Sequence, residues 1–408
     1  MKVAIVNKTF DTRRGGAEVW SVAFARWLVS QGHDVHVVVR KSGDIVPALG
    51  ATLHTIPAWS AWGFATKAAR RLPSLGCDII HDMGCGWHFD VLQSHVGSPL
   101  AYREKLLELK STGSRLFKQA RFSLPPLRSS KDLIDRQFAG PPHAIYIAVS
   151  NMVAGDLQSH HNIAEENIAV VHNGVDGTRF APVTDGHAED AVRRELGIAS
   201  NDLVLLFVAL HPGNKGVQTL VQVAARLLSE GHGIHVVIVG GVPTANELTQ
   251  VRKSGVHERV HWIGRVDDPT PYYHTANVCM HLTPYDACSL VVLEALASGL
   301  PVITTQNNGA GELVEDGVCG YVTRDAGDAD EAYQHMRSLL DADVRHTMGR
   351  NARAVAEKLT LEHNFRNIVE VYHRVLRRKG LNEPPQIEST HRLPLPGSTG
   401  DETRRRVA

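Results

Sequence analysis

Two acidic residues flank the expected start of a helix in the second half of this 408-residue chain. Asp286 follows an apolar strand, and Glu294 lies one and a half turns into a helix that Ser289 can cap. Because helical side chains lean toward the helix N-terminus, Glu294 points back toward that start. The free amides of Ser289 and Leu290 suit a phosphate. Glu294 suits a ribose diol, and Asp286 suits sugar hydroxyls. A surface glutamate on an amphipathic helix is the simpler alternative, but two carboxylates at the carboxyl end of a strand favour a ligand site.

Two turns elsewhere could also hold an anionic ligand. Gly15 and Gly16 stand between the first strand and its helix, where glycine lets a ligand approach the backbone, although a plain turn would use glycine too. Lys215 precedes Gly216 at a helix start and could neutralise a diphosphate, although most lysines are simply solvated. Neither turn has the GxGxxG or P-loop spacing, which makes an NAD oxidoreductase unlikely on this sequence.

Short apolar runs alternate with helix-period segments, which is typical of βαβ units and parallel sheets. A turn at the glycine pair leads into a helix ending near Ser30. The expected strands of the first half are Lys2–Asn7, Asp34–Val39, Asp78–His81, Asp90–His95 and Ala144–Ser150. The pattern then restarts with Leu203–Leu210, a helix over Gly216–Glu230, and strands at His235–Gly240, Val260–Gly264, Asn277–Leu282 and Leu300–Thr305.

The repeated pattern predicts two α/β domains. We place an N-terminal domain at 1–172, a linker at 173–200 and a C-terminal domain at 201–359. From Asp341 to Lys379 the chain is predicted helical, with Phe365, Ile368, Val371, Tyr372 and Val375 on one apolar stripe. We expect residues 360–379 to form a crossover helix and residues 380–408 to be a disordered tail.

Composition excludes several classes of protein. Lys and Arg together number 43, as do Asp and Glu, so no net charge points to a nucleic-acid partner. Five cysteines without a CxxC pair offer no zinc site and fit a reducing compartment. No apolar stretch is long enough to span a bilayer, and the N-terminus does not have the pattern of a signal peptide. We therefore expect a cytoplasmic protein.

Five motifs in this order resemble the retaining glycosyltransferases of family 4, which have the GT-B fold. They are GGAE at 15–18, VSNMVAGDL at 149–157, VVHNGVD at 170–176, VALHPGNKG at 208–216, and Asp286-x7-Glu294 followed by ALASGLPVI. The resemblance runs from Met1 to about Lys379. It implies two Rossmann-like domains facing across a cleft, with the acceptor side in residues 1–172 and the nucleotide-sugar site in residues 201–359. It also implies that the C-terminal helix crosses back to the N-terminal domain.

The resemblance also implies roles for single residues. Gly16, with its neighbour Gly15, matches the glycine loop beside the donor phosphates, and His95 matches the histidine that approaches the transferred sugar. Lys215 matches the diphosphate-binding lysine. Gly264 and Arg265 match the base-binding loop. Asp286 and Glu294 match the family's E-x7-E pair, with Asp286 assigned a catalytic as well as a binding role.

Other histidines and an asparagine of these motifs have competing interpretations. His81 and His172 also end expected strands and are weaker rivals of His95, which has small neighbours that leave room for a substrate. Asn173 and Gly174 match an interdomain turn and are interpreted as structural.

The sequence departs from the family pattern at two places. Asp286 is one methylene shorter than the usual glutamate. Leu210 and His211 occupy the place where many members carry an arginine before the lysine, so a second phosphate-neutralising charge would have to come from Arg265 or Arg13.

The resemblance implies metal-independent transfer of a hexose from a nucleoside diphosphate sugar, with UDP the foremost base, to a glycan or lipid-linked acceptor. Retention of configuration is expected through front-face attack, with the leaving phosphate as base. Lipopolysaccharide or cell-surface polysaccharide synthesis is the expected setting. The alternatives are a nucleotide-sugar epimerase on the same fold and a non-catalytic protein that binds a sugar nucleotide.

Basic residues gather in the first half of the chain. Residues 100–140 hold nine basic and four acidic side chains, and Lys67-Ala-Ala-Arg-Arg71 adds three more basic ones. A solvated helix face would explain them, and so would contact with an anionic membrane at its inner face. These two interpretations have equal support from the sequence.

Overall fold

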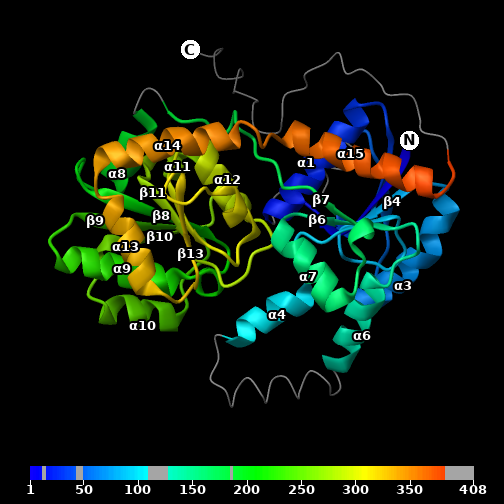
Figure 1. Cartoon of the computed structure of the whole chain (residues 1–408), viewed down its shortest axis with the longest axis horizontal. Helices are drawn as coiled ribbons and strands as arrows, with labels where there is room; N and C mark the ends of the chain where they lie inside the picture. Colours follow the sequence, from blue (N-terminus) through cyan, green and yellow to red (C-terminus); the bar gives the residue numbers. More distant parts are fainter. Residues whose placement is uncertain (12–14, 43–48, 109–126, 184–186, 382–408) are drawn as a thin grey trace, which may run out of the picture.

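The computed structural model describes residues 1–11, 15–42, 49–108, 127–183 and 187–381, without the side chains of residues 42, 127–129 and 187–190. Figure 1 shows two bodies side by side, one built on β1–β7 and the other on β8–β13. Every strand pairing within the two sheets is parallel. The fold is therefore the predicted pair of Rossmann-like halves.

The N-terminal sheet has the strand order β3-β2-β1-β4-β5-β6-β7. Its strands are β1 Lys2–Phe10, β2 Asp34–Ser42, β3 Thr52–Thr55, β4 Ile79–Asp82, β5 Val91–Gln93, β6 Ile145–Ala148 and β7 Ile168–Val170. All five strands expected in this half are confirmed. The fourth of them is shorter than expected, because β5 ends at Gln93 and leaves His95 in the following loop. The edge strand β3 has no predicted counterpart, whereas β7 lies just before His172, where a strand was expected to end.

The C-terminal sheet has the strand order β10-β9-β8-β11-β12-β13. Its strands are β8 Leu203–Ala209, β9 Ile234–Gly240, β10 Val260–Gly264, β11 Val278–His281, β12 Val302–Thr305 and β13 Gly320–Thr323. The five expected strands are confirmed, and β13 is an additional edge strand. Continuous apolar runs such as Leu203–Ala209 are typical of strands covered on both faces.

Helices cover both faces of each sheet. In the N-terminal half they are α1 Gly16–Ser30, α3 Ala61–Arg71, α4 Pro99–Glu108, α6 Leu127–Phe138 and α7 Asn151–His161. The others are α8 His187–Leu196, α9 Val217–Ser229, α10 Ala245–Lys253, α11 Thr270–Thr275, α12 Leu290–Ala297, α13 Ala329–Ser338, α14 Ala342–Ala356 and α15 Leu361–Arg378. Helix α8 lies inside the segment predicted as a linker and packs against α11.

The C-terminal helix α15 returns to the N-terminal half, as predicted. Figure 1 shows α14 over one body and α15 over α1 and the strands of the other. The predicted stripe from Phe365 to Val375 is buried in the same apolar cluster as Val3, Ile5 and Phe24. The continuous helical segment expected from Asp341 divides in two, because α14 ends at Ala356 and α15 begins at Leu361 after the cap Thr360.

The chain passes between the halves at two places that lie side by side. Val175 forms a parallel bridge with Thr360, and its amide donates to the carbonyl of Leu359 at 2.8 Å. A Cβ at Gly174 would lie 2.6 Å from the carbonyl oxygen of Thr360, so only glycine fits there. The two crossings therefore support each other as one joint.

Candidate active site

Lys215 and Asp286 form an ion pair at the carboxyl ends of β8 and β11. Gly216 has φ +87°, and a Cβ on it would lie 1.9 Å from the carbonyl oxygen of Leu282. This close approach brings the turn before α9 against the loop after β11. Lys215 Nζ then lies 2.5 Å from Asp286 Oδ2. The residues predicted to hold diphosphate and sugar are thus neighbours that contact each other.

The charge state of Asp286 follows from its neighbours. Burial alone would raise the pKa of this carboxyl, but the His281 ring and the Lys215 ammonium outweigh burial and lower the pKa to about 2. His281 Nε2 lies 3.7 Å from Asp286 Oδ2, which is longer than a hydrogen bond. Asp286 is therefore a carboxylate at any neutral pH, and it balances the charge of Lys215.

Glu294 has the opposite electrostatic environment on the next helix. Its Oε2 accepts a 2.6 Å hydrogen bond from the hydroxyl of Tyr273, a fully buried residue of α11. Burial raises the pKa of Glu294 to about 7, although the Tyr273 hydrogen bond and the charge of Arg179 act to lower it. The two acids of the D-x7-E motif thus titrate far apart.

The start of α12 differs from the sequence expectation at one group. The amide of Ser289 donates to Asn308 Oδ1 at 3.2 Å, so it is not free for a phosphate, and the serine side chain makes no capping bond. Asn308 can reach it because its amide nitrogen is held by the hydroxyl of Thr304 at 3.0 Å. The Ser289 amide would have to leave Asn308 before it could bind a phosphate, and its role at the donor site stays a prediction.

Leu290, the first residue of α12, lies against the glycine turn of the N-terminal half. A Cβ at Gly16 would lie 2.7 Å from Leu290 Cδ1, and one at Gly15 would lie 3.7 Å from Leu210 Cδ1. The structure thus brings Gly15 and Gly16 to the start of α12. Leu210, which is 46% exposed, is an apolar residue at the position where the family pattern often has an arginine.

His95 lies in the loop that follows β5 of the N-terminal half. Its ring lies 4.6 Å from the ring of Trp20 in an edge-on arrangement, and burial lowers the pKa of His95 to about 4. The buried Nε2 atom has no hydrogen-bond partner among the residues described. His95 is therefore a neutral imidazole with hydrogen-bonding capacity to spare.

The two rival histidines are engaged in contacts within the fold. His81 is fully buried, and its Nδ1 shares a 2.7 Å hydrogen bond with the hydroxyl of Tyr372 on α15. His172 Nε2 contacts Glu312 Oε1, which belongs to the C-terminal half. The Glu312 contact favours His95 over His172, and full burial makes His81 the weaker candidate, although its Nε2 also has no partner among the described residues.

Gly264 and Arg265, which were predicted to bind the base, lie at the end of β10. Gly264 has φ +76°, and the Arg265 side chain is exposed beyond it. Strand β9 separates β10 from β8 and its Lys215 loop. Arg13, the other candidate for a second phosphate charge, lies outside the described residues.

The VSN and HNG motifs make contacts between the halves. Ser150 Oγ donates to the carbonyl of Ala287 at 2.7 Å, and Asn173 Nδ2 donates to the carbonyl of Cys288 at 2.9 Å. Glu312 accepts from the amide of Asn151 at 2.9 Å. These two motifs therefore hold the loop that carries Asp286 against the N-terminal half.

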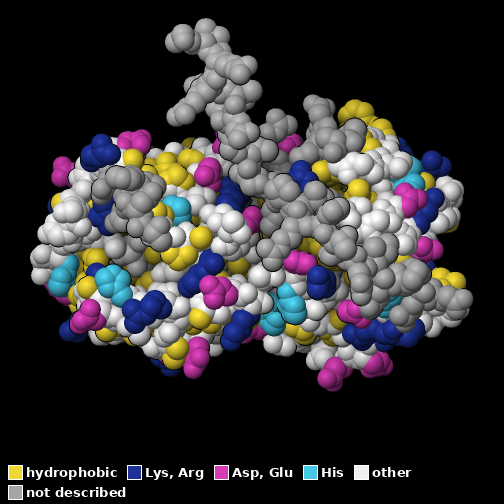
Figure 2. Space-filling model, turned by 90° about the horizontal axis from the view of Figure 1, so that it is seen from above, with side chains coloured by type: hydrophobic (Ala, Val, Ile, Leu, Met, Phe, Trp, Pro, Cys, Tyr) yellow, Lys and Arg dark blue, Asp and Glu magenta, His cyan; other side chains and the backbone are white. Residues whose placement is uncertain are grey.

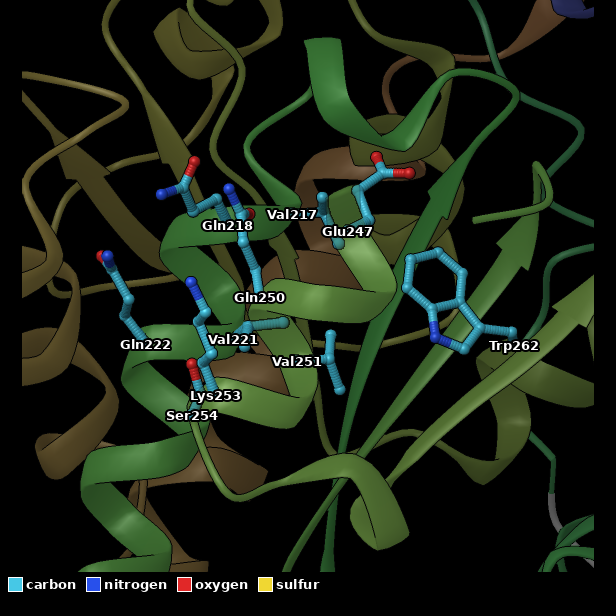
Figure 3. Close-up of a pocket in the computed structure, with 10 residues that line it drawn as sticks. All are labelled: Val217, Gln218, Val221, Gln222, Glu247, Gln250, Val251, Lys253, Ser254 and Trp262. Carbon is cyan, nitrogen blue, oxygen red and sulfur yellow. The ribbon is translucent and has the colours of Figure 1, made fainter. Parts of the chain in front are cut away.

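A separate hollow of about 140 Å³ opens between α9, α10 and β10. Figure 3 shows Trp262 on one side of it and Gln222 of α9 on the other, with Val251 between them. None of the predicted site residues lines this hollow. Its location therefore gives no support to a donor site there.

Three broader features of the described residues bear on ligands and partners. Figure 2 shows acidic and basic side chains interspersed over one face, rather than separated into patches of one sign. No described helix is long and apolar enough to cross a membrane. Among the described residues, no three His, Cys, Asp or Glu side chains are grouped as metal ligands would be. Independence from metal remains a prediction.

Comparison with known proteins gives matches in both halves of the chain. The family model described as Glycosyltransferase Family 4 matches residues 14–179, and the one described as Glycosyl transferases group 1 matches residues 202–342. D-inositol 3-phosphate glycosyltransferase of Streptomyces bingchenggensis is 26% identical over 399 residues, which cover 89% of this chain and 85% of that protein.

Two solved structures share the fold over nearly the whole chain. The crystal structure of WaaG, a glycosyltransferase involved in lipopolysaccharide biosynthesis, has a TM-score of 0.76 at 21% identity and covers 91% of this chain and 99% of its own. HepE of Anabaena, solved with UDP-glucose, has a TM-score of 0.68 at 19% identity, with coverage of 91% and 99%.

Proposed function

Because the chain belongs to the family 4 glycosyltransferases of group 1, we propose that it transfers a hexose from a UDP-sugar to a glycan or glycolipid. The observation that carries this donor assignment is the Lys215–Asp286 ion pair, which lies at the loop leading into α12, the helix that bears Glu294. The Lys215 cation matches the diphosphate of the donor. The Asp286 carboxylate matches the transferred sugar, and the Glu294 carboxyl, whose pKa is raised, matches the ribose.

In the proposed complex each residue has one role. Lys215 binds the diphosphate and stabilises the charge that develops as it leaves. Glu294 accepts hydrogen bonds from the ribose diol, and Asp286 accepts from the hydroxyls of the transferred sugar. The first-turn amide of Leu290 replaces that of Ser289 as a donor to phosphate, since the first amides of a helix have no partner within it. Gly15 and Gly16 face these phosphates, and Gly264 and Arg265 line the base.

We propose front-face transfer with retention. The bond between the anomeric carbon and the diphosphate oxygen breaks, and a bond to the acceptor oxygen forms on the same face. The acceptor proton passes to the departing phosphate. His95 is neutral, so it can donate or accept one hydrogen bond to the sugar without adding a charge beside the developing positive carbon.

The choice of UDP and of a glycan-type acceptor is supported by similar proteins. HepE has been solved with UDP-glucose, and WaaG is involved in lipopolysaccharide biosynthesis. The Streptomyces relative is named for an inositol phosphate acceptor. A lipid-linked or cell-surface glycan is our proposed acceptor, and inositol phosphate is the alternative that this relative favours.

The donor proposal is tested by nucleotide release from a panel of UDP-, GDP- and ADP-sugars without acceptor, since water can replace the acceptor slowly. We expect release from a UDP-hexose, and its loss in Lys215→Ala. The anomeric form of the first sugar released, followed by proton NMR, tests retention. Release from none of the donors would reject the assignment, and an isomerised but intact donor would indicate an epimerase.

We also propose that the protein works from the cytoplasm at the inner face of a membrane. Trp59 and Trp62 are exposed at the start of α3, and exposed Lys67, Arg70 and Arg71 follow on this helix. Indole rings and basic groups together suit the interface of an anionic bilayer. Much of the basic segment 100–140 lies outside the described residues, so α3 carries this argument.

Sedimentation with vesicles tests the membrane contact. We expect binding to phosphatidylglycerol vesicles at low salt, weaker binding at 0.5 M salt, and little binding to neutral phosphatidylcholine vesicles. Reversal of the three basic residues of α3 to glutamate should release the protein. Absence of binding at low salt would reject the contact without affecting the donor site.

A further inference from the structure

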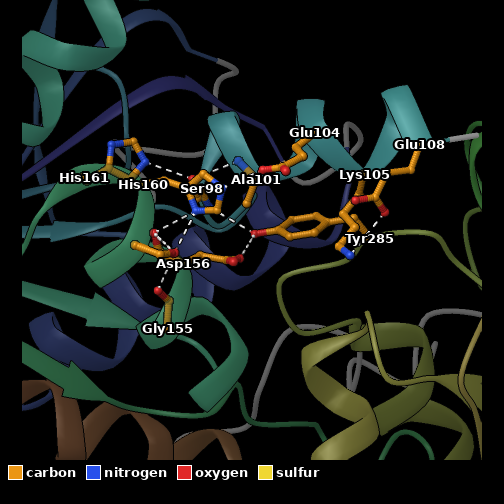
Figure 4. A network of polar contacts seen from close by, with 11 residues as sticks. Ser98, Ala101, Glu104, Lys105, Glu108, Gly155, Asp156, His160, His161 and Tyr285 are labelled. Atoms are coloured by element: carbon orange, nitrogen blue, oxygen red, sulfur yellow. Dashed lines mark hydrogen bonds and ion pairs between the residues drawn. The ribbon is translucent and has the colours of Figure 1, made fainter. Parts of the chain in front are cut away.

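Tyr285 immediately precedes Asp286, and its side chain reaches into the other half of the molecule. The residue is 3% exposed. Its hydroxyl donates to Asp156 Oδ2 of α7 at 2.8 Å and accepts from the amide of Ser98 at 3.2 Å. Figure 4 shows the ring lying between α4 and α7 with its hydroxyl toward Asp156. One phenol hydroxyl thus joins two segments of the N-terminal half to the loop of Asp286.

The Tyr285 hydroxyl occupies space that is open only because residue 97 is a glycine. Gly97 has φ +71°, and a Cβ on it would lie only 2.4 Å from Tyr285 Oη. The ring of Tyr102 lies 5.8 Å from the ring of Tyr285 and packs edge-on against it. Backbone conformation and space therefore both require glycine beside the hydroxyl.

The segments that receive the hydroxyl are themselves fixed. Ser98 Oγ accepts from the amide of Ala101 at 3.1 Å and contacts His161 Nε2 at 2.9 Å. A second link joins the same two helices, since His160 Nε2 lies 2.9 Å from Glu104 Oε2. Helices α4 and α7 therefore form one support for Tyr285 (Figure 4).

The loop on the other side is equally constrained. The amide of Asp286 donates to the carbonyl of Asn307 at 3.0 Å, and its carbonyl accepts from the amide of Gly309 at 2.8 Å. Its carboxylate is held by Lys215. A shift of Tyr285 would therefore be transmitted to the Lys215–Asp286 pair, while the segment of Ser98 begins only three residues after His95.

We propose that Tyr285 is a positioning residue for glycosyl transfer, whose hydroxyl sets the spacing between the Lys215–Asp286 pair and His95. This inference rests on the proposed function, which assigns the diphosphate to Lys215 and the transferred sugar to His95. It adds a contact between the halves that fixes the reacting sugar relative to both. Tyr285 need not touch the substrate for this role.

The protonation state of the hydroxyl fits this role. Burial and the neighbouring Asp156 carboxylate raise the pKa of Tyr285, so the hydroxyl keeps its proton and can donate. Burial also raises the pKa of Asp156, while the hydrogen bond from Tyr285 acts against this. Lys105, Glu104 and His160 are the other charged groups near this carboxyl.

Tyr285→Phe is the test, because it removes the hydroxyl and keeps the ring. Two readouts are compared, the dissociation constant of UDP alone and kcat for nucleotide release from UDP-glucose or the panel's best donor. We expect UDP affinity to stay within about 2-fold, because Lys215 and Glu294 are untouched. We expect kcat to fall about 10- to 100-fold, since small misplacements of reacting groups have effects of this size.

Tyr146→Phe is the matched control. The hydroxyl of Tyr146 is also buried, donates to the carbonyl of Phe138 at 2.8 Å and accepts from the amide of Gly140 at 2.8 Å. Both partners lie in the same half of the chain. This variant should therefore lose stability comparable to that lost by Tyr285→Phe but keep its kcat.

A double substitution tests the contact itself. Gly97→Ala should lower kcat strongly in the wild-type background, where the methyl group meets the hydroxyl. In the Tyr285→Phe background its additional effect should be smaller, because the closest atom is gone, while the strain at positive φ and the 3.2 Å contacts with Ala287 and Val153 remain in both backgrounds. Asp156→Asn keeps an oxygen that accepts from Tyr285, so its kcat should stay within about 3-fold of wild type. Asp156→Ala removes the acceptor and should lower kcat further.

Two results would overturn the inference. One is a Tyr285→Phe enzyme with wild-type kcat, and the other is a loss of kcat that Tyr146→Phe reproduces in proportion to its loss of thermal stability. Both leave the proposed function standing, because wild-type release is measured in the same experiment. A wild-type protein that releases no nucleotide would reject the proposed function and this inference together.

Discussion

The C-terminal and N-terminal contributions to the candidate site differ in charge. The C-terminal half supplies Lys215, Asp286 and Glu294, each paired with a neighbouring polar side chain or with one another. The N-terminal half supplies the glycine turn at Gly15 and Gly16 and the imidazole of His95, which burial keeps neutral. Ionic groups lie on one side, and backbone and uncharged rings lie on the other.

This difference matches two tasks in the proposed reaction. A leaving diphosphate gains negative charge and needs fixed cations and amides, which the C-terminal half can supply. The anomeric carbon gains positive charge, and a protonated histidine beside it would oppose that change. Neutral His95, supported at its flank by Trp20, avoids this repulsion.

The support behind His95 comes from the returning helix. Trp20 Nε1 donates to Asn364 Oδ1 of α15 at 2.9 Å, and Asn364 Nδ2 donates to the carbonyl of His172 at 2.6 Å. The crossover helix therefore does more than cover an apolar face, since it orients the ring that packs on His95. A neutral group gains its fixed position through packing, whereas the charged groups gain theirs through pairing.

Lys215→Ala should have the largest effect of any single change. It removes the cation and leaves Asp286 as an uncompensated carboxylate facing the diphosphate, so kcat/KM for nucleotide release should fall by about 10²- to 10³-fold. UDP affinity should fall as well. Lys215→Arg keeps the charge and should lose less. Unchanged nucleotide release in the alanine variant would show that the charged groups of the C-terminal half are not needed for departure of the diphosphate.

His95→Ala should have the next largest effect, and a different one. The neutral half does not bind the diphosphate, so the dissociation constant of UDP should stay within about 2-fold while kcat falls about 10- to 100-fold. Isothermal titration with UDP and steady-state release measure the two quantities. A marked loss of UDP affinity would show that the neutral half also binds the nucleotide, and the comparison would then fail.

Glu294→Gln tests the raised pKa. Below a pKa of about 7 the carboxyl is protonated and accepts ribose hydrogen bonds poorly, so the wild-type KM for donor should rise as the pH falls from 8 to 6. The amide cannot ionise, so the variant should have a KM about 10-fold higher at pH 8 and a flatter pH profile. The same pH slope in both proteins would assign the titration to another group.

The stability of the free enzyme should follow the same group. The pKa of Glu294 in the folded state is raised above its value in the unfolded state. The folded state therefore binds more protons than the unfolded state between about pH 4.5 and pH 7. Its contribution to stability is therefore present below the unfolded pKa and lost as the pH rises through 7. Wild type should lose thermal stability relative to Glu294→Gln over this interval, measured by the unfolding midpoint of each protein.

Sequence patterns predicted the sheets because burial on both faces produces continuous apolar runs, as in Val3 to Val6, all 0% exposed. The edge strands β3, β7 and β13 are three or four residues long and partly exposed, so they lack such runs. Ten site residues were proposed from turn chemistry and resemblance, and the structure brings Lys215 to Asp286 and Gly16 to Leu290.

The partners of these residues were beyond the reach of local patterns. Tyr273 lies 21 positions before Glu294, and Tyr285 meets Asp156 from 129 positions away. Asn308 takes the amide of Ser289 only because the two loops pack together. Such pairings depend on tertiary packing, and the local hydrophobic periodicity of the sequence does not predict them. The one signal for Tyr285 was its place beside Asp286.

Asp286→Asn should change UDP affinity only modestly, with a sign opposite to that of Lys215→Ala. In wild type the Asp286 carboxylate competes with the diphosphate for Lys215, and removal of its charge should tighten UDP binding by about 2- to 5-fold, as expected for a partly exposed ion pair. Because the pKa of Asp286 is about 2, the gain should be constant from pH 6 to 8, unlike the Glu294 effect. UDP lacks the transferred hexose, so this measurement separates the charge of Asp286 from its proposed contact with that sugar. Weaker UDP binding in the variant would mean that Asp286 orients Lys215 instead of competing for it, and the pair would then act as a preformed phosphate site.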